Sequence, residues 1–382
     1  MSLKLPGPDG ALTEIALSPR PELDVLANPP ESRSAFAASH VVMDPLCGST
    51  AHAAIDWEST MALRREIWGL GLGVAESMDT AQRGMGLSAA DAMTLAALTL
   101  AEDPRGGAGT VVGINTDDLD PGPATLAQVT AAYLRQLEFV AQRGGTPVIM
   151  ASRHLAQAAT GPEDYRAVYE RLLHEVSQPV ILHWLGEVFD PALAQYWGDP
   201  DPARAMDTVV GLIDAYSDRV AGIKISLLDP AYEVQLRRRL PAGVAVFTGD
   251  DFNYTEMIAG DDDGHSHALL GAFAALAPWA SAALKQLDAG DEKQFRAILE
   301  PTQPLSRHVF SAPTQYYKVG IVWLAYLTGK QSHPRMLGGL DGGRDLLHLA
   351  DVIRLADEIA YFPDPEFTEA RARTFFAANG IG

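Results

Sequence analysis

A lysine within an apolar segment is the residue of this sequence best suited to covalent chemistry. Lys224 lies in Val220-Ala-Gly-Ile-Lys-Ile-Ser226, whose composition predicts a β-strand. Strand alternation places Lys224 and Gly222 on one face and apolar residues on the other, so the amine is expected to point into the interior. Burial lowers the pKa of an ammonium group, and the neutral amine can attack a carbonyl carbon to form a Schiff base. The structural alternative is an ion pair with a carboxylate such as Glu76 or Asp250.

Polar side chains also end the other predicted strands: Asp44, Glu76, Ser77, Asn115, Thr116, Asp117, Ser152, Arg153, His154, His183, Asp250, Asp251, His265 and His267. An ordinary histidine titrates near pH 6.5, so His154 and His183 are candidate general acid–base residues. Arg153 could bind a substrate carboxylate through two parallel hydrogen bonds. For each of these residues, a structural hydrogen bond or ion pair is the alternative. We predict further substrate contacts from Glu76, Ser77, Asn115, Gly249 and Asp250.

Eight apolar segments that could form strands alternate with segments of helical period. The strand candidates are residues 40–43, 71–75, 110–114, 147–150, 179–182, 220–224, 244–247 and 264–268. Helix starts are indicated at Ser88, Thr125, Pro162 and Pro230. Helices are also expected in the last part of the chain, near residues 292–299, 315–327, 345–360 and 368–378.

This alternation predicts a parallel α/β fold. A doubly wound sheet usually has a glycine-rich turn after its first strand, but Asp44-Pro-Leu-Cys-Gly48 follows here. We therefore predict a (β/α)8 TIM barrel over residues 40–290, with an N-terminal extension over 1–39 and extra C-terminal helices over 291–382 packed on it. In such barrels the active site lies at the C-terminal ends of the strands, where the polar residues gather.

The segments around Lys224 resemble a known family. Gly222-Ile-Lys224 followed by Phe247-Thr-Gly-Asp-Asp251 is similar to the signature of the dihydrodipicolinate synthase and N-acetylneuraminate lyase family. Asp288-Ala-Gly-Asp291 and Pro179-Val-Ile-Leu-His-Trp184 resemble two further segments of that family. Its members are (β/α)8 class I aldolases, commonly dimers or tetramers. The resemblance implies a homo-oligomer in which Lys224 forms a Schiff base with a 2-oxo acid.

The resemblance covers residues 41–326, and the chain departs from the family at several strand ends. The family's G-T-T-G-E motif, which binds the substrate carboxylate, corresponds to Ala75-Glu-Ser-Met-Asp79. The family's strand-four tyrosine is missing from Ala151-Ser-Arg-His-Leu155, and His183 stands where tyrosine is usual. We therefore expect a divergent aldolase, lyase or dehydratase that acts on a small 2-oxo acid or a sugar-derived carbonyl compound and needs no cofactor.

Two other classes of function compete with this interpretation. A divalent-metal sugar isomerase, epimerase or lyase could use Asp44, Glu76, His265 and His267 as ligands. The two histidines alternate with Ser266 and would face the same side of a strand. A barrel that only binds a ligand is disfavoured, because so many polar residues end its strands.

The composition limits the partners of this protein. Of 382 residues, 29 are Lys or Arg and 49 are Asp or Glu, a net charge of −20 that disfavours nucleic acid and anionic membranes as partners. The single Cys47 cannot form an internal disulfide. The uncharged run Ala268–Leu284 is shorter than the roughly 20 apolar residues of a membrane-spanning helix, and Met1–Ala27 does not resemble a signal peptide. We expect a cytoplasmic protein with a small-molecule substrate.

Overall fold

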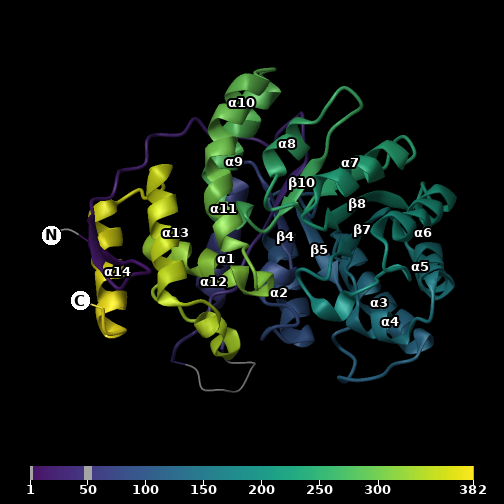
Figure 1. Ribbon diagram of the computed structural model, residues 1–382. Helices are drawn as coiled ribbons and strands as arrows, with labels where there is room; N and C mark the ends of the chain where they lie inside the picture. The colour runs from purple at the N-terminus through teal and green to yellow at the C-terminus, as the bar shows by residue number, and fades with distance from the viewer. Residues whose placement is uncertain (1–2, 47–53, 382) are drawn as a thin grey trace.

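A closed barrel of eight parallel strands forms the centre of the protein (Figure 1). The computed structural model describes residues 3–46 and 54–381, so Cys47 and Gly48 lie outside the described residues. Each strand pairs with the next along the chain, and the last pairs with the first. The strands are β3 (Ala35–Ala38), β4 (Gly73–Glu76), β5 (Thr110–Ile114), β6 (Thr146–Ile149), β7 (Val180–Leu185), β8 (Val220–Ser226), β9 (Ala245–Thr248) and β10 (His267–Leu270). The predicted (β/α)8 architecture is confirmed.

Helices follow the strands and cover the outside of the barrel (Figure 1). They are α1 (Trp57–Gly69), α2 (Ala89–Glu102), α3 (Leu126–Ala141), α4 (Arg153–Ala158), α5 (Pro162–Glu175), α6 (Pro202–Ala215), α7 (Pro230–Arg239), α8 (Tyr254–Ala259) and α9 (Phe273–Asp288). The predicted starts are confirmed, and except at Pro162 a capping side chain accepts a free backbone N–H group. Ser88 accepts the N–H of Asp91, and Thr125 forms a capping box with Gln128.

The first barrel strand lies at Ala35–Ala38, so its predicted position at residues 40–43 is wrong. Alanine is a poor strand former, and the segment therefore carries little sequence signal. The alanines of β3 suit tight packing. The Phe36 ring of the same strand fills the space that a side chain at residue 73 of β4 would need, and residue 73 is glycine. Val41 instead packs into a separate apolar cluster with Met61 and Leu87. The barrel consequently begins before residue 40.

The two ends of the chain pack together beside the barrel. A hairpin of β1 (Leu3–Pro6) and β2 (Leu12–Ile15) contacts the last two helices, as the purple and yellow segments of Figure 1 show. The C-terminal helices are α10 (Glu292–Leu299), α11 (Gln303–Val309), α12 (Tyr317–Leu327), α13 (Leu346–Glu358) and α14 (Pro365–Ala378).

Helix α12 is buried along its whole length and contacts α9, α11, α13 and α14. Its apolar residues therefore cover the chain's own interior. None of the helices within residues 3–46 and 54–381 combines the length and apolar character needed to cross a membrane.

A buried ion pair ties the first barrel strands to their helices. Arg64 of α1 donates two hydrogen bonds to Glu76 at the end of β4, with N···O distances of 2.8 and 3.0 Å, and both side chains are fully buried. Thr99 of α2 donates to the same carboxylate at 2.6 Å, and Arg64 also donates to Ser39 at 3.1 Å. The guanidinium therefore links α1 to β4 and to the end of β3.

Replacement of Arg64 by methionine should destabilise the protein strongly, because it leaves the Glu76 charge buried without its partner. We expect Arg64→Met to lower the free energy of unfolding by about 3–5 kcal/mol in urea denaturation. Arg65→Met is the matched control, since the neighbouring Arg65 forms exposed ion pairs with Glu58 and Glu102. Its loss should leave the urea midpoint close to that of the wild type, because exposed ion pairs contribute little to stability. Equal losses in the two variants would contradict this role of Arg64.

Candidate active site

Lys224 lies near the C-terminal end of β8 with its side chain inside the barrel, as strand alternation predicts. Ile223 and Ile225 on the opposite face pack into the core outside the barrel. Only 7% of Lys224 is exposed, and it lines a small cavity with residues from β7, the β4 loop, the β9 loop and helix α12. The other lining residues are Met78, Asp79, Thr80, Leu185, Phe189, Ser226, Asp251, Gly271 and Tyr317.

Gly249 leaves the space that the lysine side chain occupies. Its N–H donates to the carbonyl of Ile225 at 2.8 Å, which holds the β9 loop against β8. A methyl group at residue 249 would overlap the Ser226 hydroxyl and lie 2.8 Å from Cε of Lys224. Gly249 therefore contributes to the site by packing against Lys224.

Burial and two carboxylates act on Lys224 in opposite directions. Burial lowers its pKa, while the charges of Asp79 and Asp251 raise it and offset part of that effect. Burial also raises the pKa of Asp251 to about 7, against the opposing effect of the Ala272 N–H, which donates to its Oδ1 at 2.8 Å. The cavity thus holds an amine whose neutral form is favoured by desolvation.

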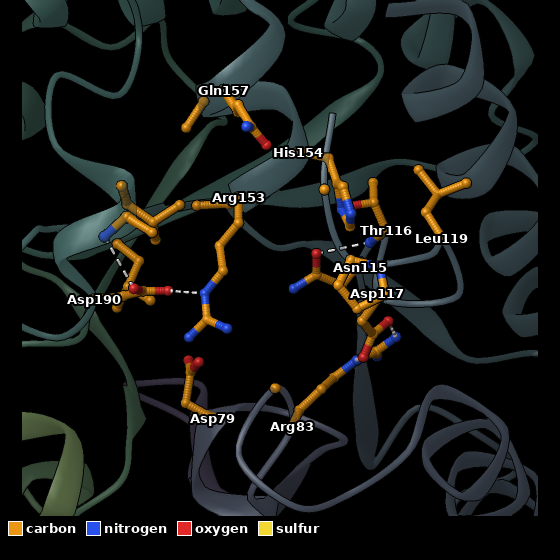
Figure 2. A pocket seen from close by; sticks show the side chains of 18 residues that line it. Asp79, Arg83, Asn115, Thr116, Asp117, Leu119, Arg153, His154, Gln157 and Asp190 are labelled. Carbon is orange, nitrogen blue, oxygen red and sulfur yellow. Dashed lines mark hydrogen bonds and ion pairs between the residues drawn. The ribbon is translucent and has the colours of Figure 1, made fainter. Parts of the chain in front are cut away.

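A larger cavity of about 570 Å³, shown in Figure 2, adjoins the lysine cavity. Asp79 and Leu185 line both. Its walls include Asn115, whose side-chain nitrogen points into the cavity in Figure 2. Arg153 donates through Nε to Asp190 at 2.5 Å, and its guanidinium group extends toward Asp79 (Figure 2). The predicted substrate contacts of Asn115 and Arg153 therefore face a common space.

A second arginine forms a rigid part of the wall of the larger cavity. Arg83 makes two hydrogen bonds to Asp117, at 2.8 and 2.7 Å, and donates to the carbonyl of Gly113 and to Gln136, each at 2.6 Å. This set of bonds accounts for most of the donors of the guanidinium group. Arg83 is therefore held for structure more than for ligand binding.

His154 lines the larger cavity, but both of its ring nitrogens are engaged. Nδ1 lies 2.9 Å from the Thr116 hydroxyl, and Nε2 lies 3.2 Å from the carbonyl of Asp120. Because a carbonyl only accepts, Nε2 carries a proton and donates to Asp120, while Nδ1 is engaged by the Thr116 hydroxyl. The ring therefore has no unengaged nitrogen for a substrate.

His183 pairs with Lys224 in the strand register and is fully buried inside the barrel. Burial and the nearby Lys224 hold the pKa of its ring well below the ordinary value. Its Nε2 lies 3.3 Å from the Ser226 hydroxyl, whereas Nδ1 has no partner among the described residues. It is not among the residues that line either cavity around Lys224. His183 is thus a neutral neighbour of the lysine.

Four predicted substrate contacts line neither cavity, and one of them is Gly249, which packs against Lys224 instead. Glu76 is bound to Arg64, and Ser77 donates to the carbonyl of Ala92 at 2.7 Å. Asp250 accepts the N–H groups of Phe252 and Asn253 and closes the turn after β9. At each strand end the side chain faces the helices or its own loop. The predicted contacts of Glu76, Ser77 and Asp250 are corrected accordingly.

The alternative metal ligands are not brought together. Glu76 is enclosed by its ion pair, and Asp44 accepts the N–H of Leu46 in the loop after β3. His265 and His267 lie at the start of β10, at the end of the barrel opposite the cavity, where Nδ1 of His267 accepts the N–H of Ser34 at 3.0 Å. No group of three or more His, Cys, Asp or Glu within residues 3–46 and 54–381 is arranged to hold a metal ion.

Two titratable residues of the lysine cavity were missing from the prediction. Asp79 begins a short 3₁₀ helix, η2 (Asp79–Ala81), after β4, and a position beyond the strand end was its only sequence signal. Tyr317 begins α12, and its hydroxyl lies 2.8 Å from that of Thr80, 237 positions away in the sequence. No local pattern could indicate that contact.

The fold is that of the dihydrodipicolinate synthase class of (β/α)8 barrels. The dihydrodipicolinate synthase of Thermotoga maritima is 13% identical, with a TM-score of 0.64 over 87% of this chain and 100% of that one. The Oceanobacillus iheyensis enzyme is 15% identical, with a TM-score of 0.61 over 85% and 96%. The 4-hydroxy-tetrahydrodipicolinate synthase of Methylacidiphilum fumariolicum is 15% identical, with a TM-score of 0.63 over 91% and 98%. The resemblance inferred around Lys224 is confirmed for the fold.

Within this class of fold, the chain belongs to the family described as "Protein of unknown function (DUF993)", whose model matches residues 3–381. A comparison with curated proteins finds no match.

Substitution at Gly249 should disturb the lysine cavity, because the added methyl group meets Ser226 and Lys224. We expect Gly249→Ala to lower the free energy of unfolding by about 1–3 kcal/mol in urea denaturation. Gly69→Ala is the control, since an added methyl at this helical position meets nothing within 4 Å. That variant should match the wild type or gain up to about 1 kcal/mol. Wild-type stability of Gly249→Ala would show that the space is not needed.

Proposed function

We propose that this protein is a Schiff-base-forming lyase of the class I aldolase type, in which Lys224 attacks the carbonyl carbon of the substrate. The observation that carries the proposal is a desolvated amine in a cavity at the C-terminal end of a closed barrel. A lowered pKa leaves more of the amine neutral, and therefore nucleophilic, at a given pH. The fold shared with dihydrodipicolinate synthases supports the same type of chemistry.

The surroundings of Lys224 favour charge separation during such a reaction. An imine at Lys224 withdraws electrons from the adjacent carbon, so a neighbouring C–C or C–O bond can break heterolytically. Asp79 and Asp251 lie beside the nitrogen that becomes positive, and their negative charge stabilises the iminium ion. The reaction is accordingly aldol cleavage, its reverse, or dehydration.

The adjoining larger cavity would bind the rest of the substrate. Arg153 uses Nε for Asp190, and among the described residues its two terminal nitrogens have no hydrogen-bond partner. These nitrogens can donate to a carboxylate or to hydroxyl groups, as can the amide of Asn115. We therefore propose a small 2-oxo acid or a sugar-derived carbonyl compound as substrate. A homo-oligomer and a cytoplasmic location remain predictions.

Reductive trapping tests the role of Lys224. We expect pyruvate or dihydroxyacetone with cyanoborohydride to add the mass of the reduced probe to the peptide that contains Lys224, as measured by mass spectrometry. Lys224→Met should abolish the label, and Lys285→Met should keep it, because Lys285 is partly exposed and pairs with Asp24. A label that persists in Lys224→Met, or no label with either probe, would falsify the proposed function.

Arg153→Gln tests how the substrate is held and separates the two substrate classes. A hydrogen bond to a charged group is worth about 1.5–3 kcal/mol, so the half-saturating pyruvate concentration for trapping should rise about 10-fold or more. The value for the uncharged dihydroxyacetone should change much less. Arg135→Gln is the control, since Arg135 pairs with Asp118 and does not line the cavity. Equal effects on both probes would argue against carboxylate binding by Arg153.

A further inference from the structure

We propose that Tyr317, at the start of helix α12 in the C-terminal segment, is the catalytic acid–base residue of the Schiff-base chemistry at Lys224. The inference rests on the proposed function and supplies the group that moves protons. It gives the C-terminal helices a part in the site itself.

Few groups around Lys224 can exchange a proton. Among the described residues that line its cavity, the other titratable side chains are Asp79, Asp251 and Tyr317. Burial raises the pKa of Asp251 to about 7, but the N–H of Ala272 and the charge of Lys224 act against this, and Oδ1 is already engaged by that N–H. Formation of an imine requires a proton donor, and the phenol of Tyr317 carries a proton to donate.

The Tyr317 ring is held in a defined position. It stacks on Phe310, with ring centroids 4.2 Å apart and planes 14° apart, and meets Phe189 edge to face at 6.3 Å. Its hydroxyl lies 2.8 Å from that of Thr80. A methyl group added at Gly271 would lie 3.2 Å from the Tyr317 ring and 3.3 Å from the Thr80 oxygen. When Thr80 donates this hydrogen bond, the phenolic hydrogen is free to point at a substrate.

The surroundings keep the phenol protonated before a substrate binds. Burial raises the pKa of Tyr317 well above its ordinary value, and the negative charges of Asp79 and Asp251 raise it further. An iminium cation on Lys224 acts in the opposite direction, because it attracts a phenolate. The proton is therefore released only once the positive nitrogen forms.

The two predicted histidines are less suitable for this role. Both ring nitrogens of His154 are bound, to Thr116 and to the carbonyl of Asp120. His183 lies outside the set of residues that line the lysine cavity. Tyr317 instead lines that cavity directly.

The proton transfers balance with Tyr317 as the only acid and base. The nitrogen lone pair of the carbinolamine forms the C=N bond as the C–OH bond breaks. The departing hydroxide takes the phenolic proton and leaves as water, which gives an iminium ion and a phenolate. The phenolate then accepts a proton from the carbon beside the iminium, and the C–H electrons form the enamine double bond. Tyr317 is neutral again, and no other reactant is consumed.

Tyr317→Phe keeps the ring and removes only the hydroxyl. We expect it to slow two rates about 100-fold or more, the usual range for loss of a general acid–base residue. One is the accumulation of the reduced pyruvate or dihydroxyacetone adduct on Lys224. The other is the exchange of the α-hydrogens of the same probes in deuterium oxide, measured by NMR. Tyr316→Phe is the matched control, since the neighbouring ring packs against Gly343 and does not line the cavity.

The possible outcomes separate the role of Tyr317 from that of Lys224. Wild-type rates in Tyr317→Phe would overturn the inference and leave the proposed function standing. Absence of any Lys224 adduct in the wild type would overturn both. An adduct without α-hydrogen exchange in the wild type would overturn proton acceptance by the phenolate. Thr80→Val removes the partner of the phenol and should slow both rates about 10-fold; an unchanged rate would argue against positioning by Thr80.

Discussion

The desolvation of one amine is the constraint on which the rest of the site depends. A charged ammonium inside a closed barrel loses its hydration, so the interior around it must be shaped to hold it. Gly249 leaves room for the side chain, and Asp79 and Asp251 supply opposite charge. These features lie at the C-terminal ends of different strands, which only a closed barrel brings to one place. The barrel is therefore the condition for a reactive lysine.

The larger cavity has a different electrostatic character. Its two arginines each pair with an aspartate, Arg83 with Asp117 and Arg153 with Asp190. In a chain with a net charge of −20, such pairing gives the cavity little attraction for anions in general. Recognition must then come from the direction of individual hydrogen bonds at Arg153 and Asn115. A site of this kind selects ligands by the placement of their oxygen atoms.

Sequence reasoning predicted the parts of the fold that local patterns encode. The strand at Thr110–Ile114 lies at the predicted residues, and the inward direction of Lys224 followed from alternation. The first strand, Ala35–Ala38, was misplaced because alanine gives no strand signal. Glu76 was assigned to the site because it ends a strand. Ala75 faces the barrel interior, so strand alternation turns the side chain of the next residue, Glu76, toward the outer helices.

Sequence patterns could not identify the site residues that tertiary packing brings from distant parts of the chain. Asp79 follows a strand end by a few residues, and the short helix that positions it has no distinctive pattern. Tyr317 reaches the lysine cavity only because α12 packs across the barrel end, through contacts that no periodicity describes. Local rules thus locate the nucleophile, and tertiary packing decides which groups surround it.

The place of α12 in the chain has a consequence for biosynthesis. A ribosome completes all eight barrel strands well before it reaches the helix that carries Tyr317. Lys224 is therefore made before Tyr317, and the cavity around the amine has the walls described above only once α12 has packed against the end of the barrel.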